Sequence, residues 1–399
     1  MGAIFKKERE RQPLDKKKAL IFVLTILFSA IYIWAGSLWA HPQSDRQAVY
    51  SQDTVKAQVS SIIAVRSTDV PGSTDAAQSI QYVYFRAKIL SGPDKGGEAV
   101  ACQIIDPNYY PVLQQINTGD KVLISPNTDG SSDAEWTMLE YLRSDVLIVL
   151  TVIFALCLLL FGRWKGLHTL IALTFTCLAV FSVFVPSVLN GRNIYAGSIV
   201  TCLFVIVSTM LLINGACAKS FAAGAGCFGG VAIAGLLTVI MDKALRLTGM
   251  IDEDTLYLQL LNPDHPIDLH GVVFAAIIIG AMGAIMDVAM DIASSLNELK
   301  QNAPDITPRG LVASGLNIGR DIMGTMANTL VLAYIGSGLC LTLLMAAYND
   351  NLLELFNLEL IVVTALQALA GSFGILLTIP LTSLFCVALY CHKKAVSHT

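Results

Sequence analysis

Residues 271–299 read GVVFAAIIIGAMGAIMDVAMDIASSLNEL, an apolar run that continues into a segment with several carboxylates. Asp287 and Asp291 stand four residues apart, and Glu298 follows seven residues after Asp291. An apolar run of about twenty residues predicts a helix that crosses a membrane. The stretch therefore raises the question of why such a helix carries ionisable groups at one end.

The composition of the whole chain places it among membrane proteins. Of its 399 residues, 54% are hydrophobic and only 14% are charged, and the mean hydropathy is +0.63. Soluble domains carry about 25% charged residues, so we predict a polytopic α-helical membrane protein. The net charge of −4 leaves no basic surface of the kind that nucleic acid requires, and we exclude nucleic acid as a partner.

About eight segments are apolar enough to be transmembrane helices. The first, 19–40, follows a basic terminus at 1–18 and is too long for a typical signal peptide, so we expect an uncleaved anchor, with cleavage after Ala40 as the alternative. The others form a seven-helix domain over 145–391, at about 145–162, 167–189, 194–214, 218–241, 269–293, 326–347 and 359–391.

The lysines and arginines beside these segments predict the orientation. Fifteen lie on the side of the amino terminus, against three on the other side, Arg192, Lys243 and Arg246. Because cytoplasmic loops carry the excess of lysine and arginine, we expect both termini, including the tail at 392–399, to be cytoplasmic.

A polar insertion at 41–144 separates the first two segments, and this orientation makes it extracytoplasmic. It alternates as strands do in VKAQVSSIIAV, SIQYVYFRAKIL, EAVACQII and KVLISP, with turn signals such as SGPDKGGE between them. We predict a small antiparallel β domain, with a five-stranded barrel of OB type as the model. It lacks the basic groove with aromatic side chains that binds oligonucleotides.

Small residues recur every four positions in 214–235, which reads NGACAKSFAAGAGCFGGVAIAG. Such a stripe lets a second helix approach closely. We therefore expect helix packing, within or between protomers, at Ala222, Gly226, Gly230 and Ala234. A phosphate-binding loop is excluded because Lys219 and Ser220 precede the glycines.

The carboxylates of the opening stretch share one helical face. At about 100° per residue, Asp287, Asp291, Ser294 and Glu298 fall within a narrow stripe that also holds Gly280. We include Gly283 beside it among the small residues expected at helix contacts. If the helix begins near Leu269 at the outer surface, Asp287 lies about 27 Å along it, near the inner boundary of a hydrocarbon layer about 30 Å thick.

A second stripe has the same spacing. In the segment after residue 310, Asn317, Asp321, Gly324 and Asn328 share one face, with Ser314 at its edge and Arg320 beside it. Three interpretations remain open for the two stripes. They are a packed helix end without a ligand, a pathway for an ion or substrate, and a docking surface for a partner. The excess of carboxylates over arginine favours a site that a proton or metal cation neutralises.

Other candidates are weaker. His265 and His270 in PDHPIDLH do not share a helical face, so a loop that leads into a helix is favoured over a metal site. Asp242 beside Lys243 is expected to be a solvated pair. Eight of the nine cysteines lie in or beside apolar segments, and Cys102 in the insertion has no partner there, so no disulfide framework is predicted.

Catalytic motifs are missing from the sequence. HExxH, GxSxG, kinase and P-loop patterns do not occur. Two aspartates in a membrane helix are also a feature of intramembrane aspartyl proteases, but the GxGD pattern of those enzymes is not found. We therefore expect neither an enzyme nor a cofactor.

The residues of both stripes resemble the YibE/F family of bacterial integral membrane proteins. The similarity is carried by IDLHGVVFAAIIIGAMGAIMDVAMDIASSLNEL at 267–299 and GRDIMGTMANTLVLAYIG at 319–336, and the anchor, the β insertion with GDKVLI and FGRWKGL at 161–167 fit the same layout. The resemblance implies a multi-pass protein of the bacterial plasma membrane with a role in transport or efflux. At Asp291 the chain departs from similar proteins, which carry a less acidic residue. The family positions present here are Gly280, Gly283, Asp287, Ser294, Glu298, Asp321, Gly324, Thr325 and Asn328.

From these observations we expect a secondary transporter or permease. Its proton or cation would bind at Asp287, Asp291, Asp321 and Glu298, with Asn317 and Asn328 as neutral ligands. The expected partners are the lipid bilayer, a small solute or ion, and a second copy or a related membrane subunit. The alternative is a membrane scaffold whose β domain binds envelope components or partner proteins.

Overall fold

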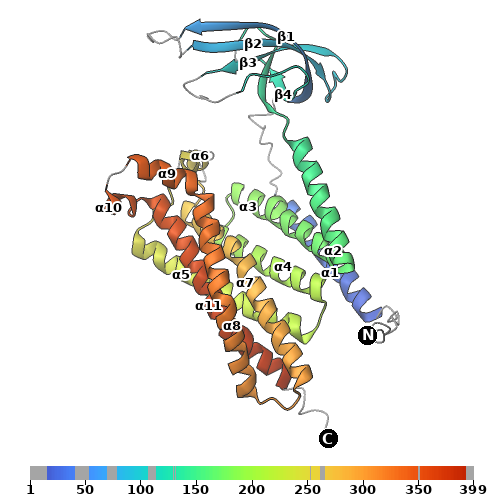
Figure 1. Cartoon of the computed structure of the whole chain (residues 1–399), viewed down its shortest axis with the longest axis vertical. Helices are drawn as coiled ribbons and strands as arrows, with labels where there is room; N and C mark the ends of the chain where they lie inside the picture. The colour runs from blue at the N-terminus through green and yellow to red at the C-terminus, as the bar shows by residue number, and fades with distance from the viewer. Residues whose placement is uncertain are drawn as a thin grey trace, which may run out of the picture. The chain divides into compact units, whose positions relative to one another are not determined.

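The structure is a computed structural model of the whole chain (Figure 1). It describes residues 16–40, 54–69, 79–106, 114–128, 130, 132–251, 253–260, 266–348 and 351–391. The expected tail at 392–399, His265 and most of the basic terminus lie outside the described residues. The chain forms two compact units, one of residues 43–157 and one of residues 1–42 with 158–399, and each is treated by itself.

The first unit is a closed five-stranded barrel. Its strands are β1 (Val55–Asp69), β2 (Ser79–Ile89), β3 (Glu98–Ile105), β4 (Lys121–Pro126) and β5 (Trp136–Tyr141). The order around the barrel is β1-β2-β3-β5-β4, and only β3 and β5 pair in parallel. This confirms the small β barrel and adds β5, WTMLEY, which the alternation of the sequence does not single out.

Alternation explains why these segments fold as strands. Val83, Phe85 and Ala87 of β2 point inward and are 0% exposed, while Arg86 and Lys88, which alternate with Ala87, are exposed. Val122 and Ile124 of β4 complete the apolar core. The core is thus filled by side chains, as in other small barrels.

The second unit is helical and begins with α1 (Lys16–Ala40). After the barrel comes α2 (Ser144–Leu178), whose residues up to 157 belong to the barrel unit, followed by the π-helical turn η2 (Ala179–Phe184) and α3 (Val185–Leu189). The sequence predicts two helices, 145–162 and 167–189, but α2 continues through FGRWKGL with a single break. Arg163 has φ 49° and ψ −126°, outside the helical region. Only residues 163–166 separate the two apolar segments, so there is no room for a longer loop. Gly166 has no Cβ and approaches the carbonyl oxygen of Leu158 closely.

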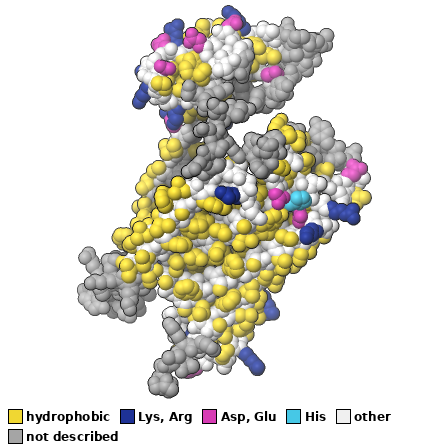
Figure 2. Space-filling model, turned by 180° about the vertical axis from the view of Figure 1, so that it is seen from behind, with side chains coloured by type: hydrophobic (Ala, Val, Ile, Leu, Met, Phe, Trp, Pro, Cys, Tyr) yellow, Lys and Arg dark blue, Asp and Glu magenta, His cyan; other side chains and the backbone are white. Residues whose placement is uncertain are grey.

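The rest of this unit is a bundle of α4 (Ile194–Asn214), α5 (Ala218–Leu245), α7 (Leu269–Asn302), α8 (Pro308–Ser337) and α11 (Glu359–Cys391). The short helices α6 (Glu253–Leu260), α9 (Leu339–Tyr348) and α10 (Leu352–Leu355) connect them. α5, α7, α8 and α11 lie side by side (Figure 1), and the outer surface of the helical unit is largely hydrophobic on the face drawn in Figure 2.

Small residues of α5 lie where α11 packs against it. Gly226 contacts Thr382 closely, and Gly230 contacts Thr378 and the carbonyl oxygen of Gly374. Ala222 and Ala234 are 0% exposed in the same core. The absence of side chains at the two glycines lets the backbones of α5 and α11 approach.

Six helices among the described residues are long and apolar enough to cross a membrane. They span Ala19–Ala40, Ser144–Leu189, Ile194–Asn214, Ala218–Leu245, Leu269–Asn302 and Glu359–Cys391. The sequence predicts eight segments, and two differences account for the gap. The second and third segments merge into Ser144–Leu189, and the seventh, 326–347, is divided between α8 and α9 by Gly338.

Candidate functional site

The carboxylate stripe of α7 lies on the face of the helix opposite to its core. Ile285, Ile292 and Leu296 are 0% exposed and pack inside the bundle, whereas Asp287 and Asp291 are exposed. Glu298 is exposed as well, and Ser294, half-buried, makes only a weak contact with the sulfur of Met290 at 3.6 Å. The carboxylates therefore do not serve the packing of α7 within the chain.

The second stripe occupies the outer face of α8 in the same way. Leu311, Gly315 and Gly319 form the buried side of α8. The exposed side carries Asn317, Arg320, Asp321 and Asn328. Arg320 donates a long hydrogen bond to Oδ1 of Asn317 at 3.4 Å. Among the described residues no ion pair joins Arg320 to a carboxylate of either stripe.

The two stripes nevertheless lie at the same level along the axes of α7 and α8. α8 runs antiparallel to α7, since Tyr334 contacts Gly280 near one end and Gly315 contacts Leu296 near the other. Counting along both helices from these contacts sets Asp291 level with Asp321 and Asp287 level with Thr325, one residue from Gly324. Polar groups from two helices thus share one height of the bundle without touching each other.

The register with α5 shows how far Asp287 lies from the ends of the bundle. Ile285 packs against Gly230 of α5, so Asp287, two residues further on, is level with Phe228. Phe228 lies nine residues from Lys219, the charged residue near the start of α5. At about 1.5 Å per residue this is roughly 13 Å inside the apolar part of α5. Within the helical unit Asp287 is therefore level with the apolar part of α5, and its depth in a membrane stays a prediction.

Next to each stripe, one glycine faces open space. At Gly283 of α7 and Gly324 of α8, an added Cβ would have no atom within 4 Å. Gly283 and, with it, Gly324 are predicted to serve helix packing, within or between protomers, and within the chain both lie on outward faces of their helices. Gly280, by contrast, is covered by the hydroxyl of Tyr334, which would lie 2.5 Å from an added Cβ and has no hydrogen-bond partner among the residues that the structure describes.

An apolar cavity continues this face of α7 away from the carboxylates. It has a volume of about 440 Å³ and is lined by residues of η2, α3, α4, α6 and α7, with Ala276, Ile279 and Gly280 on the α7 side. Ala276 and Gly280 share the face of Asp287 on the helix. A band of small residues therefore leads from this cavity to the carboxylates.

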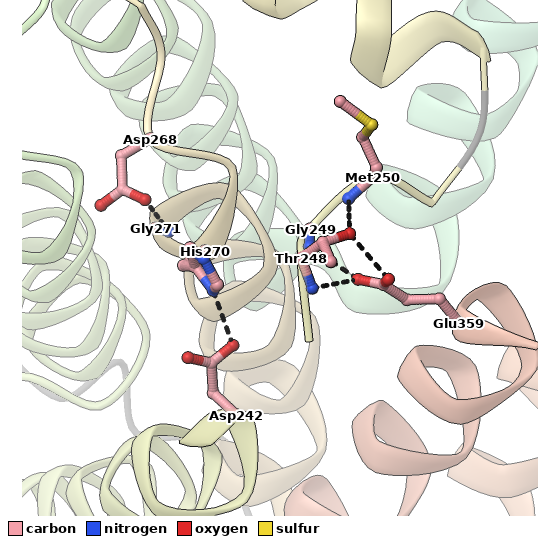
Figure 3. A network of polar contacts seen from close by, with 8 residues as sticks. All are labelled: Asp242, Thr248, Gly249, Met250, Asp268, His270, Gly271 and Glu359. Carbon is pink, nitrogen blue, oxygen red and sulfur yellow. Dashed lines mark hydrogen bonds and ion pairs between the residues drawn. The ribbon is translucent and has the colours of Figure 1, made fainter. Parts of the chain in front are cut away.

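The other end of α7 holds a polar network that the sequence does not reveal (Figure 3). Nδ1 of His270 lies 3.0 Å from Oδ1 of Asp242 at the end of α5, and Asp268 accepts from the backbone N–H of Gly271 as the N-cap of α7. Asp242 was expected to pair with Lys243 in solvent, but its partner is His270. The network fixes the end of α5 against the start of α7.

Glu359 ties a third helix to the same end. Its carboxylate accepts from the backbone N–H of Thr248 at 2.7 Å, from the Thr248 hydroxyl at 2.7 Å and from the N–H of Gly249 at 2.6 Å (Figure 3). The first residue of α11 thus holds the turn after α5. Three helices meet at this end through hydrogen bonds to carboxylates.

Metal binding has no preformed site in the part of the chain that the structure describes. No group of three or more His, Cys, Asp and Glu side chains lies close enough there to hold an ion. His270, a candidate ligand in the sequence, is engaged by Asp242. Asp287, Asp291 and Asp321 remain available to a proton or to a cation that keeps part of its water.

Comparison with known proteins adds one finding. A family model described as YibE/F-like protein matches residues 150–392. This range covers α4 to α11 and both polar stripes. No curated protein and no solved structure was found to match the chain.

Proposed function

The chain belongs to the YibE/F-like family, and on that premise we propose that it is a secondary transporter or permease of the bacterial plasma membrane. In this proposal it moves a proton or small cation along the outer face of α7. The supporting observation is the position of Asp287. It is exposed, level with Phe228 well inside the apolar stretch of α5, and next to the open space at Gly283.

Insertion in a membrane is the first part of this proposal. Six helices have the length and composition of transmembrane segments. The eight crossings predicted from the sequence require that the chain turn at Arg163 and cross again with α8 or α9. An even number of crossings leaves both termini on one side, the cytoplasmic side by the distribution of lysine and arginine.

The second part concerns the charge of the stripes. A carboxylate at such depth is costly against lipid and is retained where it meets water, a cation or a partner. In this mechanism a proton or cation binds at Asp287 and Asp291 of α7, at the level of Asp321 of α8. Asn317 and Asn328 serve as neutral ligands. The neutralised face can then move against α8, and the loss of charge lowers the cost of that movement.

The third part is the source of energy. The sequence has no nucleotide-binding motif, so the driving force in this proposal is an ion gradient or an ATPase partner. The small-residue band from Ala276 to Gly283 provides the path between the cavity at the α3 end and the carboxylates. The polar network of Asp242, His270 and Glu359 serves as the fixed end of α7 during this motion.

Flux measurements in proteoliposomes test the proposal. Proton and sodium fluxes are followed for the unaltered chain, for Asp287→Asn and for the control Asp254→Asn, which removes an exposed carboxylate from α6. We expect Asp287→Asn to abolish a flux that Asp254→Asn preserves, with equal amounts of folded protein. If Asp287→Asn instead removes folded protein, the stripe is part of the packing and the proposal fails.

A scaffold remains the second candidate because the barrel has apolar side chains on its surface. Ile62, Ile63 and Val65 of β1 are 38%, 50% and 49% exposed, and Val100 of β3 is 39% exposed. Deletion of residues 45–140 separates the two functions. A permease keeps its flux without the barrel, whereas a scaffold loses its binding to envelope components or partner proteins.

A further inference from the structure

We propose that the cleft between α1 and α4 binds one anionic phospholipid, with its phosphate at Arg192 and an acyl chain along the apolar wall. The proposal rests on membrane insertion as described above and does not depend on transport. The cleft has a volume of about 730 Å³ and lies wholly within the helical unit, between α1, η2, α3 and α4. Nothing in the proposed transport path uses it.

The cleft has the length of an acyl chain. Its α1 side extends from Phe28 to Trp39, eleven residues along the helix, or about 16 Å at 1.5 Å per residue. Ile31, Val183 and Val200 contribute apolar walls. A flexible hydrocarbon chain fits such a narrow apolar channel better than a compact solute does.

Small residues keep the channel open. At Gly197 of α4 the nearest atoms to an added Cβ, from Phe184 and Ser187, are 3.7 Å away, which is ordinary contact distance. Ala35 and Ala196 line the same space and are exposed to it. Larger side chains at these positions would therefore occupy the cleft without disturbing the helices.

One end of the cleft carries a positive charge. The guanidinium of Arg192 lies 4.7 Å from the centre of the Trp39 ring, and within the described chain no carboxylate pairs with it. Asn190 donates to the carbonyl oxygen of Ala40, and Asn193 caps α4 by accepting from the N–H of Ala196, so the loop that carries Arg192 is held against the end of α1. An arginine held in this way can bind a phosphate through two parallel hydrogen bonds.

The surroundings of the cleft identify the occupant as a lipid. The helix α1 that forms one wall of the cleft also has exposed apolar side chains outside it, among them Leu24, Leu27 and Leu38. A tryptophan beside an arginine at a helix end is typical of the interface between hydrocarbon and headgroups. A free anion would satisfy Arg192 and leave the apolar wall exposed, whereas a neutral hydrocarbon would leave the charge without a partner.

Native mass spectrometry of the full chain released from nanodiscs tests the proposal. Phosphatidylglycerol and phosphatidylcholine with identical acyl chains are offered together, and one bound phosphatidylglycerol is expected, retained about tenfold over phosphatidylcholine, as charge-assisted bonds to one phosphate allow. Arg192→Gln should remove the preference. Lys243→Gln, which deletes an exposed cation in the last turn of α5, should leave it unchanged. Ala196→Trp should reduce retention of both lipids because it fills the channel.

Two additions keep the test decisive. Arg192→Lys keeps the charge but cannot form the two parallel hydrogen bonds, so it should keep a reduced preference for phosphatidylglycerol, above that of Arg192→Gln. This variant separates a loss of binding from a loss of folding. Inorganic phosphate alone should not displace the lipid, because it cannot occupy the apolar wall. Equal retention of the two lipids by the unaltered chain, the same loss for Lys243→Gln, or displacement by phosphate would overturn the proposal. None of these readouts depends on flux.

Discussion

Replacement of Gly230 by alanine tests how closely α5 and α11 approach. An added Cβ at residue 230 would collide with Oγ1 of Thr378 and lie 2.9 Å from Cγ2 of Ile285 and 3.0 Å from the carbonyl oxygen of Gly374. Thr378 can turn its hydroxyl away, but the carbonyl belongs to the backbone of α11 and moves only with the helix. The substitution therefore pushes two helices of the core apart.

The expected magnitude follows from two opposing terms. Overpacking of a well-packed core costs about 1–3 kcal/mol, while alanine gains about 1 kcal/mol over glycine within a helix. The net loss in the free energy of unfolding is then about 0–2 kcal/mol. We expect the upper half of this range, because the backbone carbonyl of Gly374 cannot turn away from the added Cβ. For a unit of this size each kcal/mol lowers the melting temperature by about 2–4 °C. We expect Gly230→Ala to melt a few degrees below the unaltered chain.

The assay is thermal unfolding of the purified chain in detergent, with Gly224→Ala as the matched control. Gly224 lies in the same helix, and the nearest atom to its added Cβ, Cγ2 of Ile206, is 3.9 Å away. This variant should melt at the same temperature or slightly higher, because only the helix propensity changes. An equal rise for both variants would refute the close approach of α5 and α11.

Three further predictions concern the ends of helices and the barrel. Glu359→Gln should lower the melting temperature by at least a few degrees. The carboxylate accepts three short hydrogen bonds from Thr248 and Gly249, each charge-assisted bond contributes about 1.5–3 kcal/mol, and glutamine keeps only one acceptor oxygen, so at least one bond is lost. Glu354→Gln in α10 is the control, and an equal effect of both would contradict the role of the network. Arg246→Gly should raise the melting temperature, since Arg246 caps α5 with φ 52°, where glycine is favoured by about 1 kcal/mol; a lower melting temperature would show that the arginine side chain matters more than the backbone. Burial raises the pKa of the Cys102 thiol, so its reactive thiolate stays scarce as the pH rises to 8. Alkylation of Cys102, measured by mass spectrometry, should therefore be much slower than alkylation of the exposed Cys217. Similar rates for the two cysteines would show that the barrel opens.

The sequence predicts well those features that depend on neighbouring residues. Strand alternation locates β1 to β4 because these strands bury alternate side chains over part of their length, as Val83, Phe85 and Ala87 do. β5 is harder to find, since its burial alternates poorly and its pairing with β3 joins only Ala101 with Trp136 and Cys102 with Thr137. The apolar runs locate the helices for the same local reason.

Contacts between distant residues decide what the sequence could not show. Asp242 and His270 meet across 28 positions, and Glu359 reaches Thr248 across 111 positions. The same limit applies to depth. The periodicity of α7 alone does not show which residue of α5 stands beside Asp287, and only the contact of Ile285 with Gly230 reveals that Asp287 is level with Phe228. The stripes themselves were visible because helical periodicity is local, but whether they face each other was not.

Access of water to the α7 stripe tests the central proposal most directly. Gly283→Cys places a thiol on the stripe in open space, and Ile199→Cys places one on α4 at a site 46% exposed in the chain but surrounded by apolar side chains. The rate of modification by a charged, membrane-impermeant thiol reagent is measured for both in proteoliposomes by residue-resolved mass spectrometry. A water-filled pathway predicts modification at residue 283 at least about tenfold faster than at residue 199, in line with the cost of bringing a charge into hydrocarbon. Equally slow modification at both positions would place the stripe against lipid or a partner and contradict the pathway.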